Sequence, residues 1–268
     1  MSVGGGTQLL ESENTGIDVS SVSHRFEDRG RTVTALQNID LEIPAGEFVS
    51  LVGVSGCGKT TLLDLLTGLL ELQSGAITLA GRTPEAGRSD TARMFARDAL
   101  LPWRTASENI EFALATRDAD IERRRPKISD LLSAVGLTDF ADSYPSQLSQ
   151  GMRQRVAIAR TFSLESQFIF LDEPFGALDA MTKIALQSVL INLWEKTPGT
   201  SVILVTHDLG EAVALSDRVI VLSPRPGRII ADVAIDLPRP RDVRMLQTTA
   251  RFHELTADVW KLLDSQTE

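Results

Sequence analysis

Three short apolar runs constrain the fold of this 268-residue chain more than any other feature of its sequence. The runs are EFVSLVG (47–53), FIFLDE (168–173) and VILVTH (202–207), and a longer helical pattern follows each of them. Continuous apolar runs are typical of strands covered on both faces, as in a parallel sheet. The alternation of strands and helices therefore predicts an α/β fold. The length suits one large domain, or one domain with an inserted subdomain.

Small or reactive residues stand at the ends of these three strands. Gly53 ends the first run, Asp172 and Glu173 end the second, and His207 ends the third. Ligands of open parallel sheets bind beyond the carboxyl ends of the strands. We therefore expect these four residues to lie in one crevice, although the sequence separates them widely.

The segment GVSGCGKT (53–60) fits the phosphate-binding pattern G-x-x-x-x-G-K-[ST], and it lies between an apolar strand and a helical pattern. Its glycines allow backbone N–H groups to turn toward phosphate oxygens, and the helix beginning near Lys59 adds its positive end. Lys59 supplies a mobile positive charge, Thr60 offers a hydroxyl to Mg²⁺, and Cys57 is interpreted as a small loop side chain. A glycine-rich turn with a chance lysine is the alternative. The nucleotide-binding residues predicted here are Gly53, Ser55, Gly56, Cys57, Gly58, Lys59, Thr60 and Thr61.

The acidic pair and the histidine suit the chemistry of phosphate-ester hydrolysis. Such a reaction needs a carboxylate that holds Mg²⁺ and a group that positions the attacking water. Asp172 suits the first role and Glu173 the second, while His207 is expected to contact the γ-phosphate. The alternatives are an acidic pair at a strand boundary without a catalytic role and a solvated histidine.

A second predicted anion site lies in LSQGMRQRVAIAR (148–160). Ser149 can accept hydrogen bonds from backbone N–H groups, Gly151 is expected to open the backbone, and the helix is expected from about Met152. An ordinary capped helix is the alternative.

The phosphate loop, LSQGMRQR, FIFLDEP, GALD (176–179) and TH (206–207) occur in the order and spacing of ABC-transporter ATP-binding subunits. The chain resembles that family over about residues 17–235. The resemblance implies a P-loop NTPase core with a mostly parallel sheet, an antiparallel β portion near the N-terminus and an inserted helical subdomain. It also implies that ATP and Mg²⁺ bind and that two copies pair head to tail.

In such a dimer, Ser149 and Gly151 of one protomer would close on the γ-phosphate held by the other. The resemblance further implies that Asp179 faces the partner protomer and that Phe26, in VSHRF, stacks on adenine. Phe26 as a core residue is the alternative.

The resemblance also gives a place to MFARDALLPW (94–103), which would form part of the groove for a membrane permease subunit. A proline-stiffened loop with Leu and Trp offers an apolar surface to a partner helix. Alternatively, these side chains pack on their own subdomain. Ala96 departs from the family, since relatives of this type usually carry a glutamine that touches Mg²⁺ and the attacking water. LLPW, GMRQR and SPRPGRII (223–230) together resemble the nitrate, sulfonate and taurine branch of importers.

We expect residues 1–16 to form a flexible leader, 17–237 the ATP-binding domain with a helical subdomain at about 98–165, and 238–268 a helical tail. The helical patterns of the subdomain are SENIEFALA, PKISDLLSAVGL and MRQRVAIARTF.

Composition narrows the partners and the location. The net charge of −9 argues against binding nucleic acid, and the single cysteine excludes an internal disulfide framework. No apolar window is long enough to span a bilayer, and we see no signal peptide. We expect a peripheral protein on the cytoplasmic face of the cell membrane, attached through permease subunits and served indirectly by an external solute-binding protein.

The leading prediction is an ATP-hydrolysing subunit that drives import of a small anionic solute. A P-loop kinase has no use for LSQG. ABC ATPases of DNA maintenance would show a long heptad insertion, and ribosome-bound ABC ATPases would show two tandem cassettes. This sequence shows neither feature. A nucleotide-binding regulator with little turnover remains open, because Ala96 lacks the usual amide.

Overall fold

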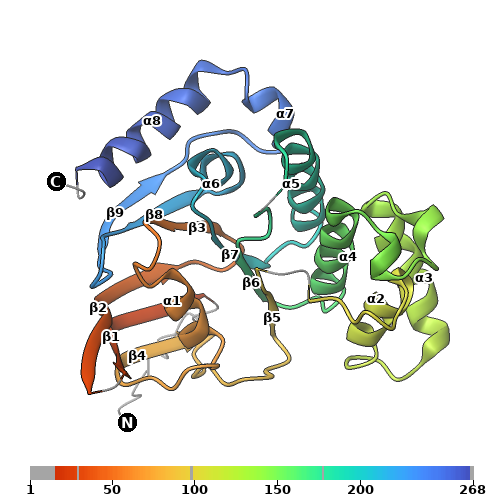
Figure 1. Cartoon of the computed structure of the whole chain (residues 1–268), viewed down its shortest axis with the longest axis horizontal. Helices are drawn as coiled ribbons and strands as arrows, with labels where there is room; N and C mark the ends of the chain where they lie inside the picture. The colour runs from red at the N-terminus through yellow and green to blue at the C-terminus, as the bar shows by residue number, and fades with distance from the viewer. Residues whose placement is uncertain (1–15, 29, 97–98, 177, 266–268) are drawn as a thin grey trace, which may run out of the picture.

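The computed structural model describes residues 16–28, 30–96, 99–176 and 178–265, so all but the last residue of the expected leader lies outside the described residues. Figure 1 shows two sheets with helices packed between and around them. The larger sheet has six strands in the order β5-β6-β7-β3-β8-β9. Their bounds are Thr91–Met94 (β5), Phe168–Asp172 (β6), Ser201–Val205 (β7), Phe48–Gly53 (β3), Arg218–Leu222 (β8) and Ile229–Ala234 (β9). The first five are parallel and β9 is antiparallel to β8, which confirms the mostly parallel sheet.

A second, antiparallel sheet is built from the N-terminal part of the chain. Its strands are β1 (Ile17–Asp28), β2 (Arg31–Ile43) and β4 (Ser74–Leu79), in the order β2-β1-β4. Helix α1 (Lys59–Leu66) packs with it on one face of the parallel sheet. Phe168 and Phe170 of β6 point into this core, whereas Ile169 and Leu171 point to the opposite face. Both faces of β6 are thus covered, as its unbroken apolar sequence predicts.

The opposite face of the parallel sheet is covered by helices. They are α4 (Gln150–Phe162), α5 (Ala180–Trp194), α6 (Leu209–Leu215), α7 (Val243–Leu246) and α8 (Ala250–Asp264). Leu186 and Leu190 of α5 are fully buried in this core, and Trp194 donates a hydrogen bond to the carbonyl of Thr200 (2.7 Å).

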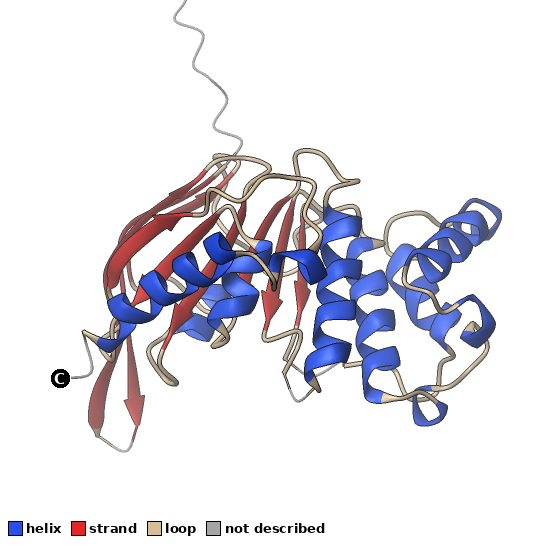
Figure 2. Ribbon diagram, turned by 90° about the horizontal axis from the view of Figure 1, so that it is seen from above, coloured by secondary structure: helices blue, strands red, loops and turns tan. Residues whose placement is uncertain are grey.

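The chain between β5 and β6 is helical and lies at one end of the parallel sheet (Figure 2). It contains α2 (Ala106–Leu114), α3 (Ile121–Ala134), two 3₁₀ turns (Thr138–Phe140 and Pro145–Gln147) and α4. Helix α3 starts five residues before the expected Pro126, because the Asp120 carboxylate accepts a hydrogen bond from the Glu122 N–H (3.0 Å). Pro126 therefore lies inside the helix.

The start of α4 also differs from the prediction. The helix begins at Gln150, so Gly151 is helical and does not open the backbone. A Cβ at Gly151 would lie 2.7 Å from Cγ2 of Thr182 in α5. Glycine at this position therefore serves the close approach of α4 to α5.

Arg239 and Arg241, in the segment between β9 and α7, bind the C-terminal part of the chain to the core of the parallel sheet. Arg239 donates to the Asp217 carboxylate (2.8 Å) and its guanidinium lies 4.3 Å from the centre of the Trp194 ring. Arg241 donates to the carbonyl of Ser216 (2.7 Å), and burial lowers the pKa of Arg241 to about 10. Phe252 and other apolar residues of α8 then pack on the core.

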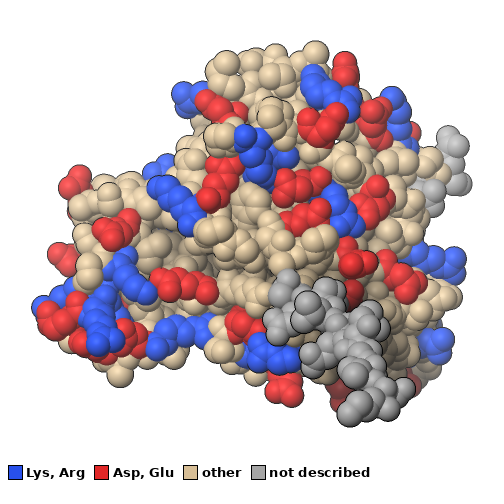
Figure 3. All heavy atoms as spheres, turned by 180° about the vertical axis from the view of Figure 1, so that it is seen from behind, with Lys and Arg blue, Asp and Glu red and all other residues tan. Residues whose placement is uncertain are grey.

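The outer surface mixes charges of both signs. On the face shown in Figure 3, basic and acidic side chains are interleaved. None of the helices in the described ranges combines the length and the hydropathy that crossing a membrane requires.

Candidate nucleotide-binding site

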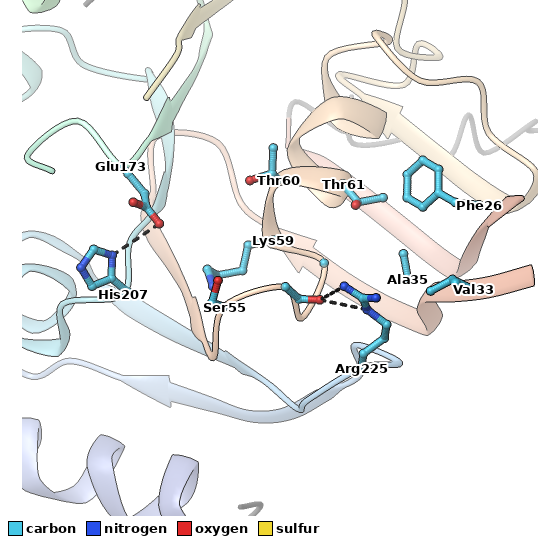
Figure 4. A pocket seen from close by; sticks show the side chains of 12 residues that line it. Phe26, Val33, Ala35, Ser55, Lys59, Thr60, Thr61, Glu173, His207 and Arg225 are labelled. Atoms are coloured by element: carbon cyan, nitrogen blue, oxygen red, sulfur yellow. Dashed lines mark hydrogen bonds and ion pairs between the residues drawn. The ribbon is translucent and has the colours of Figure 1, made fainter. Parts of the chain in front are cut away.

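A cavity of about 450 Å³ lies where the phosphate loop meets both sheets. Figure 4 shows Phe26, Val33 and Ala35 on one side of the loop and Glu173 and His207 on the other. The loop and the start of α1 contribute Ser55, Gly56, Gly58, Lys59, Thr60 and Thr61, and Arg225 completes the lining. Phe26 is 40% exposed, so it is not a core residue.

The shape of the phosphate loop depends on glycine. Gly56 and Gly58 have φ angles of 76° and 109°, in the left-handed region that other residues rarely adopt. Gly58 also precedes α1, where an added Cβ would lie 2.6 Å from Cδ2 of Leu36. The turn before α1 can therefore close only without a side chain at Gly58.

The Lys59 ammonium is buried at the base of this loop. It donates to the carbonyl of Gly53 (2.7 Å) and to that of Val54 (3.1 Å). The charge expected to be mobile is thus held by the loop itself in this conformation. Cys57 is buried in the core around α1. Cys57 and Gly53 were both predicted to bind nucleotide, and neither is among the cavity-lining residues.

The two residues predicted to hold a metal lie next to each other. The Thr60 hydroxyl is 3.5 Å from Oδ1 of Asp172. Burial raises the pKa of Asp172, and the nearby Arg93 guanidinium opposes that rise. A hydroxyl and a carboxylate at the edge of a phosphate cavity are oxygen ligands of the kind that Mg²⁺ takes together with nucleotide phosphates. The residues therefore fit a magnesium ion.

Arg93 is a site residue that the sequence analysis missed. Its guanidinium pairs with the carboxylates of Asp64 on α1 and Asp172 on β6, the latter at 3.4 Å. The side chain is only 8% exposed, and its charged end lies 4.8 Å from the centre of the Phe95 ring. Its partners are 29 and 79 residues away in the sequence, so no local pattern could reveal the pairing.

Glu173 and His207 face each other across the ends of β6 and β7. His207 Nδ1 is 3.4 Å from Oε1 of Glu173, and both side chains are partly exposed to the cavity. Glu173 has a φ of 46°, in the left-handed region, and its N–H donates to the carbonyl of Val205 (2.9 Å). This backbone conformation costs a non-glycine residue about 1–2 kcal/mol, and such strain clusters at functional positions.

A buried polar cluster supports the segment that carries His207. The Thr206 hydroxyl donates to the Glu211 carboxylate (2.6 Å), whose pKa is raised by burial. Lys183 of α5 pairs with Glu211 (3.1 Å) and with Asp208 (3.3 Å). No local sequence pattern predicted this cluster, which links the segment at His207 to α5.

The three residues predicted to serve a partner protomer, Ser149, Gly151 and Asp179, are not among the cavity-lining residues. Ser149 caps α4 and accepts from the Met152 N–H (3.2 Å), and Gly151 packs against α5. Asp179 caps α5, and its hydrogen bonds with Thr182 lower the pKa of its carboxyl. Ser149 and Asp179 are exposed. One copy of the chain therefore does not bring these residues to its own phosphate loop.

The segment MFARDALLPW begins at the end of β5 and leads to α2; residues 97–98 lie outside the described residues. The buried Asn109 amide accepts from the N–H of Leu101 (2.8 Å) and donates to its carbonyl (3.2 Å). Leu100 is 9% exposed, whereas Trp103 is 70% exposed. Packing within the chain therefore accounts for Leu100 but not for Trp103.

A glycine-shaped phosphate loop, a Thr–Asp pair that fits Mg²⁺ and a Glu–His pair converge on one cavity of a parallel α/β sheet. These features define a P-loop nucleoside triphosphatase. Residues 36–176 match the family model described as ABC transporter, and the chain belongs to that family. It is an ABC-type ATPase, an ATP-binding subunit that couples hydrolysis to transport.

Individual relatives agree with this assignment. The chain is 40% identical over 240 residues to the taurine import ATP-binding protein of Rhizobium johnstonii, covering 88% of this chain and 91% of that protein. It is 42% identical over 240 residues to the bicarbonate transport ATP-binding protein of Synechococcus elongatus, covering 88% of this chain and 36% of that one. A dimeric ATP-binding cassette in a post-hydrolysis state with ADP and Pi superposes with a TM-score of 0.73 at 30% identity, covering 83% of this chain and 100% of that chain. The α/β prediction with its antiparallel portion and helical insertion is thereby confirmed.

Proposed function

We propose that this ATPase drives import of a small anionic solute such as nitrate, a sulfonate or taurine. Relatives at about 40% identity are named for import of taurine and nitrate and for transport of bicarbonate, which share small size and an anionic group. The observation that carries the catalytic part of the proposal is the pairing of Glu173 with His207 opposite the phosphate loop.

In this proposal the cavity binds ATP along its length. The exposed Phe26 ring stacks on adenine beside Val33 and Ala35, since an aromatic face exposed in a nucleotide cavity offers a platform for a base. The backbone N–H groups of 53–60 and the N-terminal end of α1 receive the phosphates. Lys59 adds positive charge at the base of the loop.

Thr60 and Asp172 would hold Mg²⁺, which, when bound, neutralises phosphate charge. Glu173 positions the attacking water and accepts its proton, and such a base contributes roughly 10²–10⁴ to the rate. His207 contacts the γ-phosphate, and its contact with Glu173 keeps both side chains on the same side of the cavity. Positioning and charge stabilisation are the main demands of phosphoryl transfer, so these few groups suffice.

The proposed active unit is a head-to-tail homodimer. Ser149 and Gly151 of one protomer complete the phosphate site of the other, and Asp179 faces the partner. Two observations support this arrangement: Ser149 and Asp179 are exposed at helix starts away from their own cavity, and a related cassette is dimeric with ADP and Pi bound. Helix starts attract anions, so a phosphate held by another chain is a suitable ligand for α4.

The proposed membrane contact is the 94–103 segment, with Trp103 as its exposed apolar residue. Permease subunits would bind there and hold the ATPase at the cytoplasmic face of the membrane, with an external solute-binding protein delivering the solute. The same proposal takes 17–237 as the ATP-binding domain, about 98–165 as its helical subdomain and 238–268 as a helical tail.

A mixing experiment tests the paired sites. Lys59→Ala spoils the phosphate loop and Ser149→Arg spoils the completing surface, so each variant alone should be inactive. A mixture contains dimers with one intact composite site, and hydrolysis should recover to about half that of the parent in those mixed dimers. If no ratio of the two variants hydrolyses ATP faster than either alone, the head-to-tail arrangement is wrong.

One observation favours a second candidate, a nucleotide-binding regulator with little turnover. Ala96 has no side-chain atom that can bind Mg²⁺ or orient a water, where relatives of this type usually carry glutamine. Hydrolysis by the assembled transporter distinguishes the two: an importer ATPase is stimulated by its membrane partner, whereas a regulator binds ATP without comparable turnover.

A further inference from the structure

The turn between β8 and β9 is built against the nucleotide cavity. The N–H of Gly227 donates to the carbonyl of Ala35, and the N–H of Gln37 donates to the carbonyl of Gly227, both at 2.9 Å. These bonds join the turn to β2, whose Val33 and Ala35 line the cavity. A Cβ at Gly227 would lie 2.1 Å from the carbonyl oxygen of Cys57, so the turn also touches the phosphate loop. The turn is therefore fixed between the two walls of the cavity.

Arg225 extends from this turn to the phosphate loop. Its Nε and Nη2 donate to the carbonyl of Gly56 at 3.2 and 3.1 Å, and Figure 4 shows the guanidinium between the loop and the wall formed by Val33 and Ala35. These bonds use two of its five N–H groups, and Nη1 has no acceptor in the part of the chain that the structure describes. A guanidinium held in place with N–H groups to spare is prepared for a ligand.

The positively charged side chains around the cavity indicate that this ligand is a phosphate group. Among the described lining residues, the Lys and Arg side chains are Lys59 and Arg225. The Lys59 ammonium already has the carbonyls of Gly53 and Val54 as acceptors. Arg225 has a single carbonyl acceptor on one edge, and a guanidinium is suited to bidentate contact with phosphate oxygens.

We propose that Arg225 is a nucleotide-binding residue, whose guanidinium pairs with a phosphate group of ATP while remaining bonded to Gly56. The proposal rests on the proposed function only in taking this cavity as the ATP site. Arg225 lies on the side of the phosphate loop that faces Val33 and Ala35, whereas Glu173 and His207 lie on the other side (Figure 4). Arg225 therefore contributes to affinity and not to the chemical step.

The test is the affinity of the full-length chain for ATP, ADP and adenosine, measured by calorimetry for the parent and five variants: Arg225→Met, Arg225→Lys, Arg225→Gln, Arg228→Met and Lys59→Ala. A charge-assisted hydrogen bond at an exposed site predicts that Arg225→Met weakens ATP binding about tenfold. ADP binding should fall as well, and adenosine binding should stay within twofold. Arg225→Lys keeps the charge and should recover more of the ATP affinity than Arg225→Gln, which keeps only a hydrogen-bond donor for Gly56.

Arg228→Met is the matched control. Arg228 lies on the same turn, is exposed, donates to the Gln37 side chain (2.7 Å) and is not among the cavity-lining residues. It removes the same charge and should leave ATP affinity within twofold of the parent. The proposal is overturned if Arg225→Met binds ATP like the parent, if adenosine binding falls as much as ATP binding, or if Arg225→Gln is as good as Arg225→Lys. If instead the parent binds no ATP, or Lys59→Ala binds it equally well, the ATP site itself is misplaced.

Discussion

Replacing Arg93 by methionine should destabilise the fold, because the substitution leaves the buried Asp172 carboxylate without its positively charged partner. The Asp172 and Arg93 side chains are 9% and 8% exposed, so neither can recover full hydration when the other is removed. Removing one partner of a buried pair costs about 3–5 kcal/mol. Asp64 is 27% exposed and can turn toward water, so we expect a value near the lower end, about 3 kcal/mol.

The assay is urea denaturation followed by circular dichroism, without nucleotide or Mg²⁺, at several pH values. Burial already raises the pKa of Asp172, and loss of Arg93 raises it further. A carboxyl with a raised folded-state pKa favours the folded state at low pH and loses that contribution as the pH rises. The loss in free energy of unfolding caused by Arg93→Met should therefore be smaller near pH 5 than at pH 8.

A double variant separates uncompensated charge from lost packing. Arg93→Met with Asp172→Asn removes both charges at nearly constant volume and should recover more than half of the lost stability. A loss below about 1 kcal/mol in the single variant, or a double variant no more stable than the single, would refute the reasoning that Arg93 neutralises a buried carboxylate.

Three further predictions concern other parts of the chain. The hydrogen bond from Arg88 lowers the pKa of Asp90. The ionised Asp90 therefore stabilises the fold at pH values above its ordinary pKa of 3.8, and this contribution is lost as the pH falls. Asp90→Asn should lower the free energy of unfolding by about 1–3 kcal/mol at pH 7, and by progressively less in acid. Ala96→Gln should raise hydrolysis or lower the Mg²⁺ concentration it needs, and identical Mg²⁺ titrations would show that another group has taken over the contact. Leu101→Asp or Trp103→Ala should weaken co-purification with the membrane partner while ATP affinity is kept, and intact assembly would remove the loop from the interface.

Local patterns predicted much of the fold and the centre of the site. The apolar runs ending in Gly53, Glu173 and His207 identified three adjacent strands, β3, β6 and β7. The rule for parallel sheets predicted that the ends of these strands share one crevice, and Glu173, His207 and the phosphate loop after Gly53 do line one cavity. This worked because strand burial and the phosphate loop are both encoded over fewer than ten consecutive residues.

What the sequence could not show is interaction between distant segments. Arg93 and Arg225 are ordinary basic residues until the fold brings Asp172 and Gly56 beside them. Gly151 seemed to serve the backbone, yet its requirement comes from Thr182 on another helix. The start of α3 was missed because Pro126 suggested a first turn, while the Asp120 cap lies six residues earlier.

The central claim is that the Glu173 carboxylate positions the water that attacks ATP in a dimer. The rate of ATP hydrolysis by Glu173→Gln tests this claim most directly. The measurement is steady-state phosphate release by the parent and the variant, together with their ATP affinity and size-exclusion profiles. We expect hydrolysis to fall by roughly 10²–10⁴ while ATP still binds, with an ATP-bound dimer accumulating. A variant that releases phosphate at the parent rate would contradict the account and remove Glu173 from the mechanism.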